Sequence, residues 1–140
     1  MRRSVLFAVL AAFVLAVPAG AGSGSKATPV HKITQSASYL MIDPIYTTIM
    51  DGNKIVGLLM IGIGLDVPDA ELRAQTEQAL PVLRDVYVRS LMAFTATSVR
   101  PWRQPDVSEI ADRLQHATDR SLGRQGARIL LAQVAMRLTK

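Results

Sequence analysis

The stretch 51-DGNKIVGLLMIGIGLDVPD-69 contains a turn, a long apolar segment and the start of a helix in direct succession. Asp51-Gly52-Asn53 is typical of the tight turn of a β-hairpin. In the segment 54–67 both alternating sets of residues are mostly apolar, which is typical of a strand covered on both faces. We therefore predict that this segment is the central strand of a sheet.

Two glycines, Gly62 and Gly64, fall on the same face of this predicted strand. Their missing side chains indicate either the close approach of another backbone or a bulge. A dinucleotide-binding loop is not indicated, because Val67 stands where the third glycine of that motif is required.

The residues before the turn, 39-YLMIDPIY-46, form a second and shorter apolar run. Pro44 lacks an amide donor, so it belongs in an edge strand or at a bulge. We predict that this run pairs with the central strand as a hairpin. The turn does not resemble a calcium loop, because the other oxygen ligands are absent at the required spacing.

Helical patterns begin after the central strand. Pro68 suits the first turn of a helix, and Asp69 and Glu71 complement the positive end of its dipole. Pro81 removes one helical hydrogen bond and clashes with a preceding carbonyl, so we predict a kink or a restart there. Apolar residues then continue at helical spacing through Phe94, which predicts one buried face.

Another helix and a strand are predicted in the last third of the chain. Asp106 and Glu109 have the spacing of a capping box, which predicts the start of a helix. Gly123 is a natural end for this helix. The segment 127-ARILLAQVAMRL-138 is apolar on both alternating faces, which predicts a strand.

The predicted element order is therefore ββααβ, with the first helix kinked. This order predicts an α+β fold with a small mixed or antiparallel sheet and the helices packed on one of its faces. Because the last strand returns through a helical crossover, we expect it to run parallel to one strand of the hairpin.

The N-terminal residues predict export. Arg2 and Arg3 precede an apolar run over 5–17, which Pro18 and the small residues 19-AGA-21 follow. This pattern is typical of a signal peptide over 1–21, with an uncleaved membrane anchor as the alternative. Residues 22–37 are predicted to be a flexible linker and residues 38–140 one domain in the periplasm. Loss of 1–21 lowers the net charge from +5 to +3, which suits solubility and an anionic membrane surface.

The chain offers little for catalysis. It has no cysteine, which excludes thiolate chemistry, and its serines lack a nucleophile-elbow context. His116 follows Asp112 by four residues, and a surface pair on a helix explains this spacing. Zinc ligands at a suitable spacing are absent, and His31 falls in the predicted linker. We predict no enzymatic activity, no cofactor and no metal site.

The loop 100-RPWRQP-105 is the clearest candidate for an interaction site. It places the only tryptophan, Trp102, between Arg100 and Arg103, in a backbone stiffened by two prolines. An indole flanked by guanidinium groups suits a protein interface or a lipid headgroup layer. The alternative is that the indole covers the edge of the core. Nucleic-acid binding is not predicted, because further aromatic residues for stacking are missing.

The main helix carries a family motif. Pro81, Leu83, Arg84 and Asp85 match the pattern P-x-[IL]-R-D, and 91-LMAFT-95 follows. A long apolar strand precedes this motif, and a second helix and a closing strand follow it, 109-EIADRLQHATDRSL-122 and 127-ARILLAQVAM-136. In the order and spacing of these elements, residues 39–137 resemble the periplasmic domain of the flagellar basal-body-associated FliL family. The chain departs from the family in its short N-terminal apolar run, in the loop 100-RPWRQP-105 and in the ending 136-MRLTK-140.

The resemblance implies a stomatin-like α+β fold and a role at the flagellar motor. It implies an oligomer, contact with stator or basal-body proteins, and a position at the inner-membrane surface, in support of motility. The candidate interface residues are Arg84, Asp85, Arg89, Trp102, Arg100 and Arg103. The alternative function is a periplasmic protein that binds a small molecule or a lipid, on the Gly62/Gly64 face or beneath the kinked helix.

Overall fold

The computed structural model describes residues 36–139. The predicted signal peptide, 1–21, and all but the last two residues of the predicted linker, 22–37, lie outside these residues. The helices and strands, in chain order, are β1 (Tyr39–Asp51), β2 (Lys54–Asp66), α1 (Ala70–Ser98), α2 (Val107–Leu122) and β3 (Arg128–Leu138).

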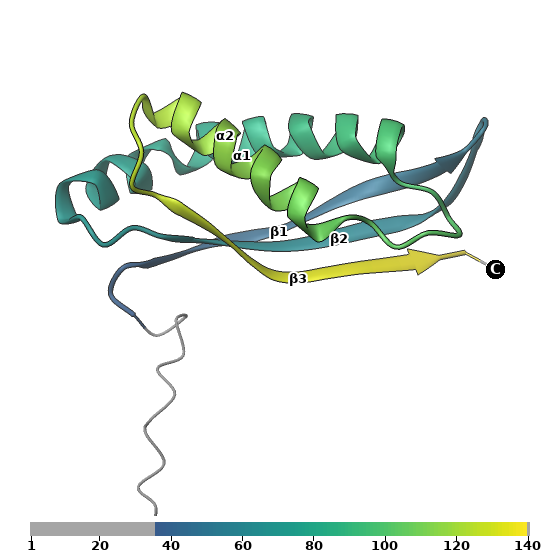
Figure 1. Ribbon diagram of the computed structural model, residues 1–140, viewed down its shortest axis with the longest axis horizontal. Coiled ribbons are helices and arrows are strands. Elements are labelled where there is room, and N and C mark those ends of the chain that lie inside the picture. The colour runs from purple at the N-terminus through teal and green to yellow at the C-terminus, as the bar shows by residue number, and fades with distance from the viewer. Residues whose placement is uncertain (1–35, 140) are drawn as a thin grey trace, which may run out of the picture. The chain divides into compact units, whose positions relative to one another are not determined.

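The three strands form one antiparallel sheet in the order β1-β2-β3, and both helices lie on the same face of it (Figure 1). The predicted α+β class, the element order ββααβ and the central position of β2 are confirmed. Because β3 is antiparallel to β2, it runs in the same direction as β1 without pairing with it.

The hairpin of β1 and β2 follows the local signals in the sequence. Gly52 has a φ of 58°, which the first central residue of a type II′ turn requires. β1 is an edge strand, and its register with β2 shifts between Ile42 and Ile45, on either side of Pro44. The proline therefore lies where a missing amide donor costs least.

One core lies between the sheet and the helices. Alternate residues of β2, among them Ile61 and Leu65, point toward the helices, and Leu83 and Leu91 of α1 pack against them. The largest fully buried side chains are Tyr87, Phe94, Ile49, Leu59, Ile61, Ile63, Leu65, Leu72, Leu83, Leu91, Ile110 and Leu114.

The other face of the sheet is open in the described part of the chain (Figure 1). Ile55 and Leu58 of β2 are 61% and 44% exposed, and Met41 and Tyr46 of β1 are also exposed. The prediction that both faces of β2 are covered is therefore wrong. Three strands are only about 10 Å wide, so two helices side by side cover one face and leave none for the other.

The glycines of β2 serve different purposes. The register of β2 with β3 shifts directly after Gly62, so this glycine marks a bulge. The space beside Gly64 is filled by the aromatic ring of Tyr39. The close approach of another backbone occurs at Gly57, where an added Cβ would lie 2.5 Å from the carbonyl oxygen of Arg137.

The predicted restart at Pro81 is wrong, because α1 is one helix from Ala70 to Ser98 with the proline inside it. Pro81 removes only the hydrogen bond to the carbonyl of Glu77. Both residues are exposed, so water can bind that carbonyl. Thr76 and Leu83, on either side of the proline, are both fully buried. Packing on the sheet thus helps to keep the helix continuous through the proline.

The helix ends have the expected caps. Asp69 caps α1 by accepting a hydrogen bond from the amide of Leu72 at 2.7 Å. Gly123 ends α2 with a φ of 71°. These contacts agree with the signals at both positions.

The capping-box spacing at α2 is only half realised. Asp106 accepts hydrogen bonds from the amides of Ser108 and Glu109, at 2.9 and 3.2 Å. The hydrogen bond from the Ser108 hydroxyl, followed by these amide bonds, lowers the pKa of the Asp106 carboxyl. The carboxylate of Glu109 pairs with Arg113 rather than with the cap. Asp106 therefore caps the helix, but the return hydrogen bond from the Asp106 amide to the Glu109 carboxylate is not formed.

Two buried hydrogen bonds connect the elements around the core. The hydroxyls of Thr47 in β1 and Thr95 in α1 are 2.7 Å apart. The hydroxyls of Tyr87 in α1 and Thr118 in α2 are 2.6 Å apart. Burial raises the pKa of Tyr87 to about 12. The two bonds fix the position of α1 against the sheet on one side and against α2 on the other.

Candidate interaction surface

Arg84 reaches from α1 to β1, with 44% of its side chain exposed to solvent. Its guanidinium donates a hydrogen bond to the backbone carbonyl of Asp43 at 3.0 Å and lies 3.8 Å from the carboxylate of the same residue. Asp43 belongs to the irregular segment of β1 next to Pro44. Arg84 therefore joins the middle of α1 to the β1 bulge.

Asp85 and Arg89 lie on the solvent side of α1. They form an ion pair at i, i+4, and both side chains are more than half exposed. Such pairs stabilise a helix by only a few tenths of a kcal/mol. Because Arg84 turns toward β1, the predicted set Arg84, Asp85 and Arg89 does not form one contiguous patch.

The contact between Arg84 and Asp43 gives a test of a structural role. We expect Arg84→Glu to lower the free energy of unfolding by no more than about 1 kcal/mol, because Arg84 is nearly half exposed and Asp43 is mostly exposed. The exchange Arg84→Glu with Asp43→Arg should recover most of that loss. Urea unfolding of the 140-residue chain measures both. A loss above about 3 kcal/mol would show that Arg84 is essential to the fold.

The loop after α1 holds a tight turn, which we call the Trp102 turn (Arg100 to Arg103). The amide of Arg103 donates to the carbonyl of Arg100 at 3.1 Å, and Pro101 occupies the second position, where its fixed φ suits the turn. The side chain of Trp102 is 76% exposed. The alternative in which the indole covers the edge of the core is wrong.

The Trp102 turn is separate from the charged residues of α1. Arg89 lies nine residues before the end of α1 at Ser98, which is about 13 Å along the helix axis. The six predicted interface residues thus fall into a contact with β1, an exposed ion pair and an exposed turn. Only Trp102 presents a large apolar side chain among them.

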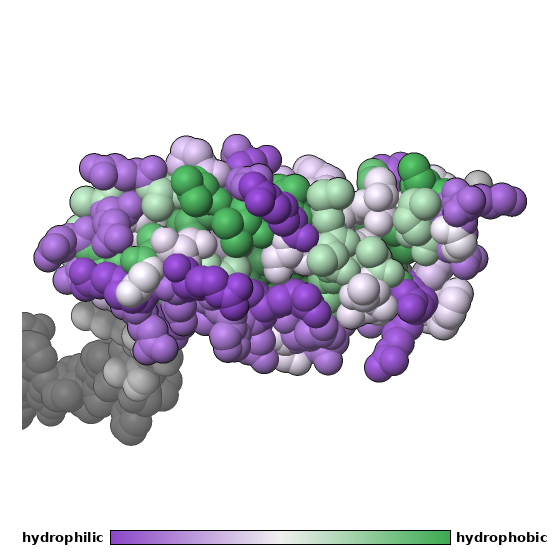
Figure 2. All heavy atoms as spheres, turned by 90° about the horizontal axis from the view of Figure 1, so that it is seen from above, coloured by the Kyte–Doolittle hydropathy of each residue, from purple (hydrophilic) through white to green (hydrophobic). Residues whose placement is uncertain are grey.

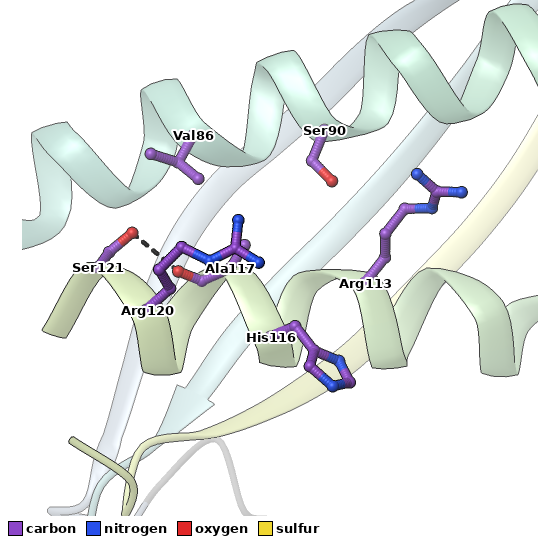
Figure 3. A pocket seen from close by; sticks show the side chains of 7 residues that line it. All are labelled: Val86, Ser90, Arg113, His116, Ala117, Arg120 and Ser121. Carbon is purple, nitrogen blue, oxygen red and sulfur yellow. Dashed lines mark hydrogen bonds between the residues drawn. The ribbon is translucent and has the colours of Figure 1, made fainter. Parts of the chain in front are cut away.

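Sequence reasoning missed a groove between the two helices. It encloses about 620 Å³. We call it the interhelical groove, and it is lined by Val86, Ser90, Arg113, His116, Ala117, Arg120 and Ser121. In Figure 3 the side chains of Val86 and Ser90 point from α1 toward α2, and Arg113 extends from α2 toward α1.

Arg113 is anchored at one end of the interhelical groove. It donates to the carboxylate of Glu109 at 2.9 Å, and its guanidinium carbon lies 5.5 Å from the centre of the Phe94 ring. The Nε atom is buried and has no hydrogen-bond partner among residues 36–139. Arg113 is thus held in place while one donor stays unused.

Some of the other polar side chains that line the groove make hydrogen bonds within the protein and others make none. Within the described residues, the side chains of Arg120 and Ser90 make no hydrogen bond, and Arg120 makes no ion pair. The hydroxyl of Ser121 donates to the carbonyl of Ala117 at 2.8 Å (Figure 3). Arg120 of α2 and Ser90 of α1 therefore both keep free hydrogen-bond donors.

His116 lies at the rim of this groove and points away from α1 (Figure 3). Its Nδ1 bonds to the backbone carbonyl of Asp112 at 2.7 Å. The predicted side-chain pair is therefore replaced by a bond within the helix. The available signal in the sequence was the spacing of Arg113 and Arg120, two turns apart on one flank of α2.

A second hollow lies where α1 passes the β1 bulge. It encloses about 310 Å³, and its lining residues are Met41, Ile42, Asp43, Leu80, Pro81 and Arg84. This cleft is the feature nearest to the pocket predicted beneath a kinked helix. The ring of Tyr39 fills the space beside Gly64. A larger hollow, of about 850 Å³, lies farther along β2 and is lined by Thr48, Ile55, Gly57, Leu58, Arg137, Leu138 and Thr139.

Comparison with known proteins finds no matching family model and no matching curated protein. The resemblance to the FliL family therefore rests on the residues quoted above. In residues 36–139 no helix is long and apolar enough to span a membrane. The same residues contain no group of three or more side chains suited to hold a metal ion.

Proposed function

We propose that this chain is an exported, non-enzymatic protein of the flagellar basal body. In this proposal it contacts stator units and supports motility. The observation that carries the proposal is the exposed Trp102 turn, at the end of a helix that has the P-x-[IL]-R-D pattern. The observed ββααβ order agrees with what that resemblance implies.

The Trp102 turn has the properties of an interaction site. Tryptophan and arginine are the residues most enriched among those that dominate binding energy at protein interfaces. Here the indole is exposed, while Arg100 and Arg103 flank it in a turn closed by a backbone hydrogen bond. The turn is therefore ordered before a partner arrives, which lowers the entropic cost of binding.

Binding of a small apolar or lipidic ligand is the second candidate function. The cleft between Pro81 and the β1 bulge favours it, because Met41, Leu80 and Pro81 supply an apolar lining and Arg84 a cation. A volume of about 310 Å³ is at the lower end of the range for ligand pockets. The Trp102 turn has no role in this function, so the two functions are separable by mutation.

Crosslinking in the native cell tests the proposal. Tagged full-length chain is crosslinked, purified and its attached proteins identified by mass spectrometry. We expect stator or basal-body proteins with the wild type and a loss of most of them with Trp102→Ala. Because Trp102 is exposed, this variant should change the free energy of unfolding by less than about 0.5 kcal/mol.

Met92→Ala is the matched control. Met92 is also a large, exposed apolar residue, but it lies on α1. We expect this variant to retain the crosslinked partners and to support swimming in a deletion strain. Recovery of unrelated envelope proteins alone, or normal swimming of the deletion strain under load, would contradict the flagellar function.

A further inference from the structure

We propose that the interhelical groove binds an acidic, amphipathic helical segment of a partner protein, through Arg113 and Arg120. The inference rests on the proposed function only for the premise that the chain has a protein partner. The groove lies on the helix side of the molecule, where Figure 2 shows hydrophobic side chains in a band along the long axis, bordered by hydrophilic ones.

The charge of the groove favours an anionic partner. Its ionisable side chains are Arg113, His116 and Arg120, all from α2, and the α1 residues that line it are uncharged. Glu109 offsets Arg113 in part, but Arg120 has no acidic partner among the described residues. A partner carboxylate at each guanidinium would form charge-assisted hydrogen bonds, and the free hydroxyl of Ser90 is a further donor in the lining.

The spacing favours a helix over a single small ion. Arg113 and Arg120 are seven residues apart, so their positions on α2 are separated by about 10 Å along the axis. Carboxylates at i and i+7 of a partner helix have the same separation. Between the arginines the groove is lined by Val86 and Ala117, which suit the apolar residues at i+3 and i+4 of that helix.

The fixed position of the Arg113 guanidinium also supports binding of an acidic partner. Its stacking on Phe94 and its bond to Glu109 hold the guanidinium in place, while the buried Nε is left without a hydrogen bond. The Nε atom is closed to solvent, so a carboxylate in the groove would bind the terminal nitrogens of this partly exposed side chain. Because the guanidinium is already held in place, binding would not have to order it first.

Fluorescence anisotropy with a designed peptide tests the proposal. The probe is a labelled, end-capped helical peptide with Glu at i and i+7 and Leu at i+3 and i+4. It is titrated with the full 140-residue chain in a neutral detergent. The matched peptide has Gln in place of both Glu residues. We expect saturable binding of the first peptide and at least tenfold weaker binding of the second.

Two variants locate the binding. Arg120→Glu should weaken binding of the acidic peptide at least tenfold. Arg137→Glu makes the same charge change on β3, away from the helices and without breaking an ion pair within residues 36–139, and should weaken it less than twofold. Thermal unfolding should show that both variants are folded.

Three results would overturn the proposal. They are the absence of saturable binding, an equal loss in Arg120→Glu and Arg137→Glu, and tighter binding of inorganic phosphate than of the peptide. The last result would assign the groove to a small oxyanion. Neither variant alters the Trp102 turn, so crosslinking of cellular partners through that turn is tested independently of the groove.

Discussion

Replacing Gly57 by valine is expected to lower the free energy of unfolding by about 3 kcal/mol. Gly57 pairs with Ile49 on one side and with Leu138 on the other, in the middle strand of the sheet. A Cβ at this position would lie 2.5 Å from the carbonyl oxygen of Arg137. Because the obstacle is backbone, β3 must move away from β2, which weakens the hydrogen bonds between these strands.

Urea unfolding measures this effect, and Gly62→Ala is the control. A Cβ at Gly62 would meet only ordinary contacts, the nearest being the amide nitrogen of Gln133 at 3.4 Å. We expect Gly62→Ala to change the free energy of unfolding by less than about 1 kcal/mol, and Gly57→Ala to fall between the two variants. If Gly57→Val and Gly62→Ala cost the same, the close approach of the β3 backbone is not what requires glycine at position 57.

The contrast between these glycines shows which parts of the fold a sequence can predict. The turn at Gly52, the bulge beside Pro44 and the helix stop at Gly123 each depend on the backbone of a few neighbouring residues. Local rules therefore placed them correctly. The need for glycine at position 57 depends on a strand about eighty residues later in the chain, and no local pattern contains it.

The two errors about the fold have a common physical cause. The apolar residues on the second face of β2 predict a covered face, and Pro81 predicts a kink or a restart of the helix. Both interpretations assume that local composition decides the outcome. Which sheet face is covered depends on how many helices are available, and the continuity of α1 depends on packing on both sides of Pro81.

The candidate site could be predicted only in part. The sequence singled out Trp102 because an indole between two arginines is unusual, and the structure places it in solvent. It could not show that Arg84 turns toward Asp43, because that contact joins α1 to the β1 bulge. The interhelical groove was missed for the same reason, since Ser90 and Arg120 belong to different helices.

Alkaline pH is expected to destabilise the protein through Tyr87. The phenol has a pKa of 10.0 when exposed and about 12 in the folded protein, because burial disfavours its charged form. The folded state therefore holds the proton more tightly than the unfolded state. The stability that depends on the neutral phenol is fully present below pH 10 and is lost between about pH 10 and 12. Two pKa units correspond to a total of about 2 to 3 kcal/mol, half of it lost by pH 11.

The difference in unfolding free energy between the wild type and Tyr87→Phe isolates this effect, because every other ionisable side chain is the same in both proteins. At pH 8 we expect the wild type to be more stable by about 1 kcal/mol, since it alone has the hydrogen bond to Thr118. At pH 11 that advantage should have disappeared. Urea unfolding at intervals between pH 8 and 11 measures the difference. A difference that is constant over this range would show that the pKa of Tyr87 is the same in the folded and unfolded states. Tyr87 would then not be buried in the core in solution.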